Sequence, residues 1–255
     1  MIVTIDGPAG AGKSTAARCL ARRLGFRFLD TGAMYRAVTW VCCQAGIDLT
    51  HADAVLNAAR GMQLELGDDT VHVAGRDISA EIRTPEITRE SRHVAANNAV
   101  RAHLIDRQRE FARNRNVVTE GRDQGTIAFP HAECKFYLVA DPQERALRRQ
   151  RELAARGQPV ALEELLQQQT HRDQRDAERE FGAMRPATDA REIDTSNLTL
   201  EQVIDTLERI VRERLVESNI RCSTITSLGK SSSWISLNND RKHNDNIREY
   251  RFNQW

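Results

Sequence analysis

The chain has 255 residues, enough to bury a sizeable core in one or two domains, and its formal charge of +1 argues against a general polyanion-binding surface and a nucleic-acid partner. Its five cysteines are odd in number and form no C-x-x-C pair, so we expect reduced thiols in a cytoplasmic protein rather than a disulfide framework. No apolar run approaches the ~20 residues of a transmembrane helix, and the first motif starts too early to leave room for a signal peptide, so no membrane association is expected.

A glycine-rich loop near the N-terminus is the first chemical signal. It follows apolar residues 1–5, which predict a buried strand, and precedes residues 13–24, which predict an amphipathic helix capped by Gly25. The loop fits G-x-x-x-x-G-K-[ST] at every fixed position. The alternative is a chance glycine-rich turn, and the strand before it and the helix after it favour a phosphate-binding loop.

The residue types of this loop predict how it binds ATP. Glycines let backbone N–H groups turn inward around phosphate oxygens, and the helix N-terminus adds positive potential. Lys13 can reach the β- and γ-phosphates, and the Ser14 hydroxyl can bind Mg²⁺. The predicted ATP-binding residues are Gly7, Pro8, Ala9, Gly10, Ala11, Gly12, Lys13, Ser14 and Thr15.

A second candidate phosphate site follows the next predicted strand. Residues 26–29 predict that strand, and residues 33–45 predict a helix after the turn Asp30-Thr31-Gly32. A Thr-Gly turn that leads into a helix with Tyr35 and Arg36 could hold a phosphate and a ring. An ordinary helix with a packed Tyr and a solvated Arg is the equal alternative.

The middle of the chain is predicted to be mostly helical, with one small sheet. Residues 53–64 predict a helix. Between residues 64 and 82, alternation at Val71 to Ala74 and turn signals on both sides predict short antiparallel strands. Residues 86–115 predict one long, charged helical stretch whose apolar face includes Arg101.

Two more buried strands are predicted, at residues 117–119 and 134–140. Open parallel sheets bind their ligands at the carboxyl ends of the strands. Arg122 and Asp123 follow the first of these strands, so we expect them to face the site. A plain turn or cap role is the alternative for each.

A charge-dense region follows, with helices predicted at residues 144–156 and 161–179. The spacing places Arg172, Arg175 or Asp176, and Arg179 along one side of the second helix. Such a run is usually a solvated face of paired charges. The functional alternative is a mobile lid that folds cations over a triphosphate.

The end of the chain changes in composition. Residues 193–195 predict a last strand, and residues 199–216 predict an amphipathic helix that closes the body. Residues 217–255 contain no Ala and no sustained apolar period, so they predict a polar, disordered tail.

Taken together, these motifs resemble those of the bacterial cytidylate kinases, a family of P-loop nucleoside monophosphate kinases. The resemblance covers about residues 1–215 in order. The matching stretches are Ile5 to Thr15, Leu29 to Arg36, Glu81 to Thr84, Glu120 to Asp123 with Gly125-Thr126 and Phe129-Pro130, Arg172 to Asp176, Pro186 to Ala190, and Asp194 to Ser196.

The resemblance implies an α/β fold of the P-loop NTPase type: three α/β/α layers around a central parallel sheet, with a monophosphate-binding insert that contains a small antiparallel sheet, and a helical lid. The kinase domain would span residues 1–216, followed by the tail at 217–255. Within that domain the expected core is 1–30, 110–148 and 183–216, the monophosphate-binding part is 31–109, and the lid is 149–182.

The resemblance also implies the site residues. The family's CMP-binding positions fall on Thr31, Tyr35, Arg36, Arg101, Arg122, Asp123, Asp176 and Arg179. Catalytic roles would fall on Lys13, Arg122, Arg172, Arg175 and Arg179. Two positions depart from the family pattern: Arg92 stands where many relatives carry Ser, with Ser91 beside it, and Gln124 stands where relatives usually carry Met.

The implied reaction is transfer of the γ-phosphoryl group of ATP to CMP or dCMP, giving CDP or dCDP and ADP, with Mg²⁺ as cofactor. We expect a cytoplasmic monomer that works in pyrimidine nucleotide metabolism. Two rival hypotheses remain: a P-loop kinase for another acceptor such as UMP, AMP or a metabolite hydroxyl, and a nucleotide-dependent switch without turnover. The guanine motif N-K-x-D, usual in such switches, does not occur in the sequence.

Overall fold

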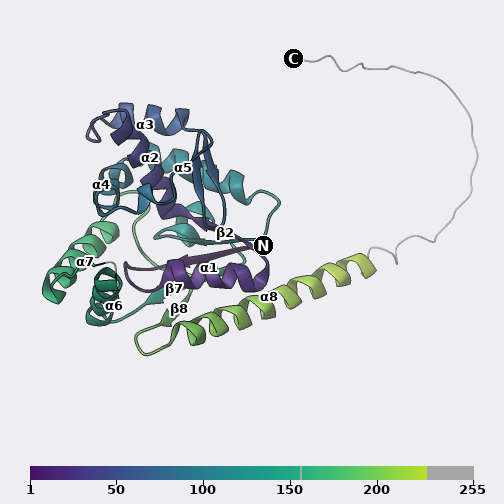
Figure 1. Cartoon of the computed structure of the whole chain (residues 1–255). Coiled ribbons are helices and arrows are strands. Elements are labelled where there is room, and N and C mark those ends of the chain that lie inside the picture. The colour runs from purple at the N-terminus through teal and green to yellow at the C-terminus, as the bar shows by residue number, and fades with distance from the viewer. Residues whose placement is uncertain (156, 229–255) are drawn as a thin grey trace, which may run out of the picture. The chain divides into compact units, whose positions relative to one another are not determined.

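The structure of the chain is a computed structural model that describes residues 1–155 and 157–228. Its centre is a five-stranded parallel sheet in the order β2-β6-β1-β7-β8 (Figure 1). The strands are β1 (Ile2–Asp6), β2 (Arg27–Asp30), β6 (Val117–Glu120), β7 (Cys134–Val139) and β8 (Arg191–Asp194). Because the strands are parallel, their carboxyl ends meet at one edge, where Ile5 is in register with Glu120 and Asp6 with Tyr137.

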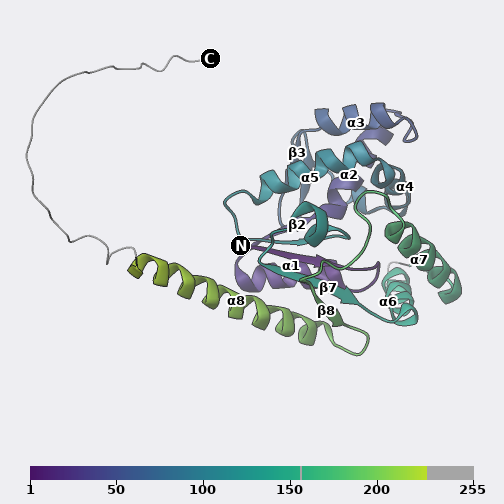
Figure 2. The same ribbon diagram turned by 180° about the vertical axis from the view of Figure 1, so that it is seen from behind.

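Helices cover both faces of this sheet, as the two opposite views show (Figures 1 and 2). They are α1 (Lys13–Leu24), α2 (Thr31–Gln44), α3 (Ala52–Gly61), α4 (Pro85–Ala96), α5 (Asn98–Ala112), α6 (Pro142–Ala155), α7 (Leu162–Ala177) and α8 (Leu200–Leu228). Two short segments complete the list, the 3₁₀ turn η1 (Glu81–Arg83) and the π-helical turn η2 (Gln124–Ala128). The predicted three-layer α/β/α fold with a central parallel sheet is therefore confirmed.

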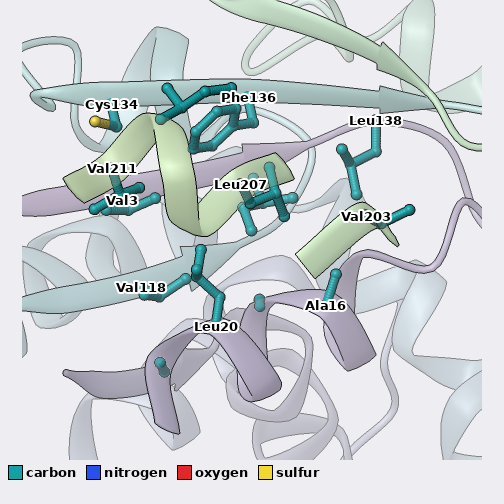
Figure 3. Close-up of a cluster of buried hydrophobic side chains, with 14 of the residues drawn as sticks. Val3, Ala16, Leu20, Val118, Cys134, Phe136, Leu138, Val203, Leu207 and Val211 are labelled. Carbon is teal, nitrogen blue, oxygen red and sulfur yellow. The ribbon is translucent and has the colours of Figure 1, made fainter. Parts of the chain in front are cut away.

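Two apolar cores hold the layers together, one on each face of the sheet. Between the sheet and helices α1 and α8, Val3 and Phe136 pack with Leu20 and Leu207 (Figure 3). On the other face, neighbouring strand residues such as Leu29 pack against α2 and α5. Successive strand residues point to opposite faces, and both faces of the three inner strands β1, β6 and β7 are buried, which explains why these strands are rich in apolar residues.

The predicted small sheet lies between α3 and η1. It is antiparallel and consists of β3 (Leu64–Leu66), β4 (Val71–Val73) and β5 (Arg76–Asp77). Its buried side chains form a third apolar cluster with Ala33 and Ala37 of α2. This packing attaches the insert to the helix that begins at Thr31.

Two predicted helix boundaries in the first half were wrong. The stretch predicted as one helix over residues 86–115 is two helices, because the Asn97 side chain accepts from the backbone N–H groups of Ala99 and Val100 and so starts α5 anew. The helix predicted from residue 33 already begins at Thr31, because the Asp30 carboxylate caps it by accepting from Ala33 N at 2.8 Å.

Two boundaries in the second half also differ. Helix α7 ends at Ala177, so Arg179 lies just beyond the helix rather than along its side. Helix α8 continues to Leu228, past the predicted end at Val216, and no Gly or Pro interrupts the sequence before Gly229. The rest of the predicted tail, residues 229–255, lies outside the described residues.

The chain divides into two units, of which Met1–Leu215 is compact and contains the sheet. The finer division into core, monophosphate-binding part and lid stays a prediction. Among the described residues, every helix is too short or too polar to cross a lipid bilayer.

Candidate active site

The glycine-rich loop joins β1 to α1 at the carboxyl edge of the sheet. Gly7, Gly10 and Gly12 have φ of 135°, 80° and 85°, in the region that L side chains rarely adopt. A Cβ on Gly7 would lie 2.1 Å from the carbonyl oxygen of Leu138 on β7, so only glycine lets the chain leave β1 beside this strand. The loop therefore has the backbone that a phosphate cradle requires.

Lys13 and Ser14 open helix α1 at the end of this loop. Lys13 is buried, and its Nζ donates a hydrogen bond to Pro8 O at 2.7 Å. Burial, together with the positive charges of Arg122 and Arg172, lowers the pKa of Lys13 from 10.5 to about 7. Ser14 is exposed. An arriving polyphosphate would supply the negative charge that this buried ammonium lacks.

A cluster of charged side chains joins the end of β6 to helix α7. Asp176, on α7, accepts from Arg122 Nε at 2.9 Å and pairs with Arg179 Nη2 at 2.5 Å. Burial alone would raise the pKa of Asp176, but Arg122, Arg179 and Arg172 outweigh it and lower that pKa. Arg172 is exposed to solvent, yet Arg122 repels its charge and contributes most to lowering its pKa to about 10. Excess positive charge is thus concentrated beside Lys13.

A buried ion pair lies next to this cluster. Arg101 Nη2 of α5 is 2.5 Å from Asp123 Oδ2, and both side chains are almost fully buried. The Arg101 guanidinium lies 5.9 Å from the ring centres of both Tyr35 and Phe181. Its Nε is buried without a hydrogen-bond partner. Burial raises the pKa of Asp123 in spite of Arg101 and Arg179, so a further hydrogen-bond donor on Asp123 and an acceptor on Arg101 would both be favourable.

The other predicted site residues are placed as follows. Thr31 Oγ1 donates to Glu120 O at 2.7 Å, which ties the start of α2 to the end of β6. Arg36 lies 3.4 Å from Asp30, and its Nε is buried without a partner. Arg175 is exposed and donates to His171 O within its own helix, so the structure does not bring it into the cluster of Arg122 and Asp176.

The side chains at the two departures from the family pattern make hydrogen bonds with residues other than Arg101 and Asp123. Arg92 is exposed and donates from Nε to His93 Nε2, and the adjacent Ser91 donates to Thr88 O. Gln124 is buried, where its side chain accepts from Thr119 Oγ1 at 2.9 Å and donates to Gln108 at 3.2 Å. Gln124 is thus a core residue in this chain.

Three contacts at the site were missed by the sequence reasoning. Asp6 accepts backbone hydrogen bonds from the segment after Asp123, Gly182 lies directly against the Arg101–Asp123 pair, and Asp173 of α7 accepts from Ala9 N at 3.3 Å. Asp6 stands immediately before the first glycine of the loop, which was the one available signal. Asp173 lies in the matching stretch Arg172 to Asp176, but the sequence does not indicate its partner, and nothing local marks Gly182, because the partners of both are more than 50 residues away.

The sheet is parallel, has a phosphate loop at its carboxyl edge, and has buried arginine–carboxylate pairs beside that loop. These features define a P-loop α/β protein arranged as a small phosphotransferase. A family model, cytidylate kinase, matches residues 3–213. The chain belongs to the cytidylate kinase family, as its motifs predicted.

Individual relatives agree with this assignment. A cytidylate kinase of Rhodopirellula baltica is 48% identical over 213 residues, which are 84% of this chain and 93% of the relative. One from Clostridioides difficile is 40% identical over 205 residues, covering 80% and 95%. A bifunctional pantoate ligase/cytidylate kinase of Synechococcus is 47% identical over 224 residues, but these are only 41% of that longer protein.

Proposed function

We propose that this chain transfers the γ-phosphoryl group of ATP to CMP or dCMP, giving CDP or dCDP and ADP. The observation that carries the proposal is the buried Arg101–Asp123 pair, which lies next to the charged cluster of Arg122, Asp176 and Arg179 and interacts with Arg179. On one side of the site, the phosphate loop with Lys13 would hold a triphosphate. On the other side, Asp123 offers a buried acceptor and Arg101 a buried donor. Family membership supports the same reaction.

The pair suits the edge of cytosine. That edge offers one donor, N4, and two acceptors, N3 and O2. The Asp123 carboxylate would accept from N4, and the Arg101 guanidinium, with its unpartnered Nε, would donate to N3 and O2. Uracil would instead present a carbonyl to Asp123, and such a buried mismatch costs ~1–3 kcal/mol, more where a charge is involved.

The transfer step needs alignment and charge stabilisation rather than a general base, because a phosphate oxygen is already anionic at pH 7. We infer that Lys13 stabilises the triphosphate while Arg36, Arg122 and Arg179 hold the acceptor phosphate and the moving phosphoryl group. Asp176 keeps Arg122 and Arg179 in place at 2.9 and 2.5 Å, and we propose that it also meets a ribose hydroxyl. Thr31 and Tyr35 would complete the acceptor side.

Residues 149–182 would act as a lid. Its helix α7 reaches the phosphate loop, since Asp173 accepts from Ala9 N and pairs at 2.5 Å with Arg145, which in turn donates to Ala9 O. We propose that Arg172 and Arg175 move over the phosphates when this region closes and so exclude water, which would otherwise compete as acceptor. Arg175 would have to release its bond to His171 to do so.

The donor set fits a Mg²⁺ ion that arrives with ATP. No group of three or more His, Cys, Asp or Glu side chains in residues 1–155 and 157–228 could hold a metal alone. Ser14 is exposed on the first turn of α1 and would hold the ion together with phosphate oxygens, which matches the preference of Mg²⁺ for few protein ligands. When bound, the ion would neutralise phosphate charge.

An acceptor panel tests the proposal. ADP release from ATP and Mg²⁺ is measured with CMP, dCMP, UMP, AMP and no acceptor, on the full chain and on a version that ends at Val216. We expect CMP and dCMP to accelerate ADP release most, in both versions. ADP release that no acceptor accelerates would contradict the proposal and favour a nucleotide-dependent switch. Sedimentation of the same samples tests the proposed monomer, and fractionation of cells tests the proposed cytoplasmic location.

A further inference from the structure

Asp6 is a buried carboxylate that the transfer step does not use. It is the last residue of β1, is only 4% exposed, and precedes the first glycine of the phosphate loop. Its Oδ1 accepts from Gln124 N at 2.9 Å, and its Oδ2 accepts from Gly125 N at 2.7 Å. Both amides belong to the first residues of the π-helical turn η2, directly after Asp123.

These two hydrogen bonds join the donor and acceptor sides of the site. On one side, the chain continues from Asp6 into Gly7 and the phosphate cradle. On the other side, Asp6 holds Gln124 and Gly125, which directly follow Arg122 and Asp123 in the chain. A second, backbone bond runs parallel to them, from Gly121 N to Ile5 O at 3.1 Å. The segment from Gly121 to Gly125 is thus bonded to β1 at both ends.

The contact leaves little room for adjustment. A Cβ on Gly125 would lie 3.0 Å from Thr4 Oγ1 and 3.4 Å from Asp6 Oδ2, so a side chain there would press the segment away from β1. A carboxylate offers a separate acceptor oxygen to each of the two amides, as Asp6 does here. An asparagine of the same shape accepts one and turns an NH₂ donor toward the other.

We propose that Asp6 is a positioning residue, which sets the distance between the phosphate loop and the Arg122–Asp123 segment and thereby aligns the acceptor nucleotide with the donor. This inference rests on the proposed function. It predicts that loss of the Asp6 carboxylate harms use of CMP while the phosphate loop, formed by its own glycines, still binds ATP.

The first test compares Asp6→Asn with Asp141→Asn. Asp141 also accepts from two backbone amides, Gln143 N at 2.8 Å and Glu144 N at 3.2 Å, but both bonds end on Oδ1 and lie at the exposed start of α6. For Asp6→Asn we expect kcat/KM for CMP to fall about 100-fold, the scale of a ~1 Å misplacement, and KM for ATP to stay within about twofold. Asp141→Asn should leave both unchanged. A rise in KM for ATP as large as the loss in kcat/KM for CMP, or an unchanged kcat/KM for CMP, would overturn the inference.

A second variant covers the case that Asp6→Asn does not fold. Gly125→Ala leaves the carboxylate in place and displaces its amide partner, so it should show the same selective loss for CMP. A Gly125→Ala protein with normal kcat/KM for CMP would also overturn the inference. If the wild type shows no ADP release stimulated by CMP or dCMP, the proposed function itself fails and the inference falls with it.

The pH profile gives a readout that a purely structural role would not move. Burial raises the pKa of Asp6 from 3.8 to about 6, with Lys13 on α1, Asp123 and Tyr137 on β7 as the titratable groups around it. Substrate phosphates titrate near pH 6 as well, so the quantity to plot is the ratio of wild-type to Asp6→Asn kcat/KM, in which they cancel. We expect this ratio to be large at pH 8 and to approach one below pH 5. A ratio that does not change with pH would contradict the role of the ionised carboxylate.

Discussion

Arg101 Nη2 and Asp123 Oδ2 are 2.5 Å apart in a site where neither side chain is more than 8% exposed. The two residues come from different elements, α5 and the segment after β6. Each side chain compensates part of the other's charge, and each still has hydrogen-bonding capacity left. The cytosine edge would complete both, and this makes the pair the most informative place to test selectivity.

Asp123→Asn should change the preferred base. The amide can turn an NH₂ donor toward the O4 carbonyl of uracil. It also replaces one of the carboxylate oxygens that would accept from cytosine N4. We expect kcat/KM for CMP to fall about 10- to 100-fold, corresponding to ~1–3 kcal/mol, and the ratio of UMP to CMP use to rise. The measurement is the acceptor panel at saturating ATP. An unchanged UMP to CMP ratio, with normal CMP saturation, would place the base elsewhere.

Asp123→Ala tests how much the Arg101–Asp123 pair contributes to the free energy of unfolding. It leaves Arg101 buried without its partner, and loss of one member of a buried pair costs about 3–5 kcal/mol of unfolding free energy. Urea unfolding measures this loss. KM for ATP in the folded fraction should stay near the wild-type value, because Asp123 does not belong to the phosphate loop.

Lys13→Met should abolish transfer without loss of stability at pH 7. The folded pKa of Lys13, about 7, lies below its ordinary value of 10.5, so the unfolded chain binds the extra proton between these values and stability rises with pH across that window. The variant should therefore gain most, relative to wild type, below pH 7, and the gain should shrink toward pH 10.5. Activity assays and thermal unfolding at several pH values check both points.

Lys135→Met is the matched control for that variant. Lys135 is also buried, but its Nζ donates to Pro130 O at 2.6 Å and pairs with Asp189 at 2.9 Å rather than with a residue of the phosphate loop, and its stem lies beside Gly125. We expect this change to lower stability and to leave the turnover of folded protein intact. Loss of turnover in both variants would mean that buried lysines support activity only through the fold.

Asp176→Asn should weaken both the fold and the reaction, because Arg122 and Arg179 lose their shared carboxylate. We expect a loss of about 3 kcal/mol at pH 7. The pKa of Asp176 is lowered, so its contribution is present above 3.8 and is lost as pH falls through the folded value; the difference from wild type should shrink at pH 3. Asp189→Asn changes an acceptor that is 62% exposed, and its buried partner Lys135 keeps the hydrogen bond to Pro130 O, so this change should cost ~1 kcal/mol or less. Equal costs for the two variants would contradict the assignment.

Gly182→Ala should obstruct the base site. A Cβ there would lie 2.1 Å from Asp123 Oδ2 and 2.2 Å from Arg101 Nη2, and the residue has φ of 71°. We expect the left-handed conformation to cost ~1–2 kcal/mol of stability and the collision to raise KM for CMP about tenfold. Gly46→Ala separates the two effects, because Gly46 has φ of 64° and open space around it. It should show the stability loss alone; a raised KM for CMP in Gly46→Ala would mean that backbone strain is the cause.

Asp6→Asn should cost activity but not stability at neutral pH. The pKa of Asp6 is raised from 3.8 to about 6, so the folded state binds more protons than the unfolded state between these values and wild-type stability falls as pH rises from 4 to 6. The shift corresponds to about 3 kcal/mol, which Asn does not incur, against ~1 kcal/mol for one lost hydrogen bond. Urea unfolding from pH 4 to pH 8 should show the variant gaining on wild type. A variant that loses ground as pH rises would contradict this account.

Much of the fold could be predicted from the sequence. The strand, loop and helix of the phosphate site follow from an apolar run, three glycines and a 3.6-residue period, all within residues 1–25. The positions of the other strands and the small antiparallel insert follow in the same way, because apolar runs and turn signals are local in the chain, whereas β1 pairs with β6 and β7 across more than 100 residues. The errors fell at helix ends, where single side chains such as Asn97 and Asp30 decide by capping.

The sequence by itself determined the phosphate loop, the parallel α/β architecture, the family and the identity of the charged residues around the site. Only the tertiary structure decided how these charges pair: Asp176 with Arg122 and Arg179, Asp123 with Arg101, and Asp6 with the amides of Gln124 and Gly125. The tertiary structure also decided that the Gln124 side chain is buried in the core and that Arg175 is exposed to solvent. The physical reason is range. Propensity and periodicity act over a few residues, whereas these partners are, apart from Arg179, 22 to 119 positions apart and meet only after the sheet and its helices have packed.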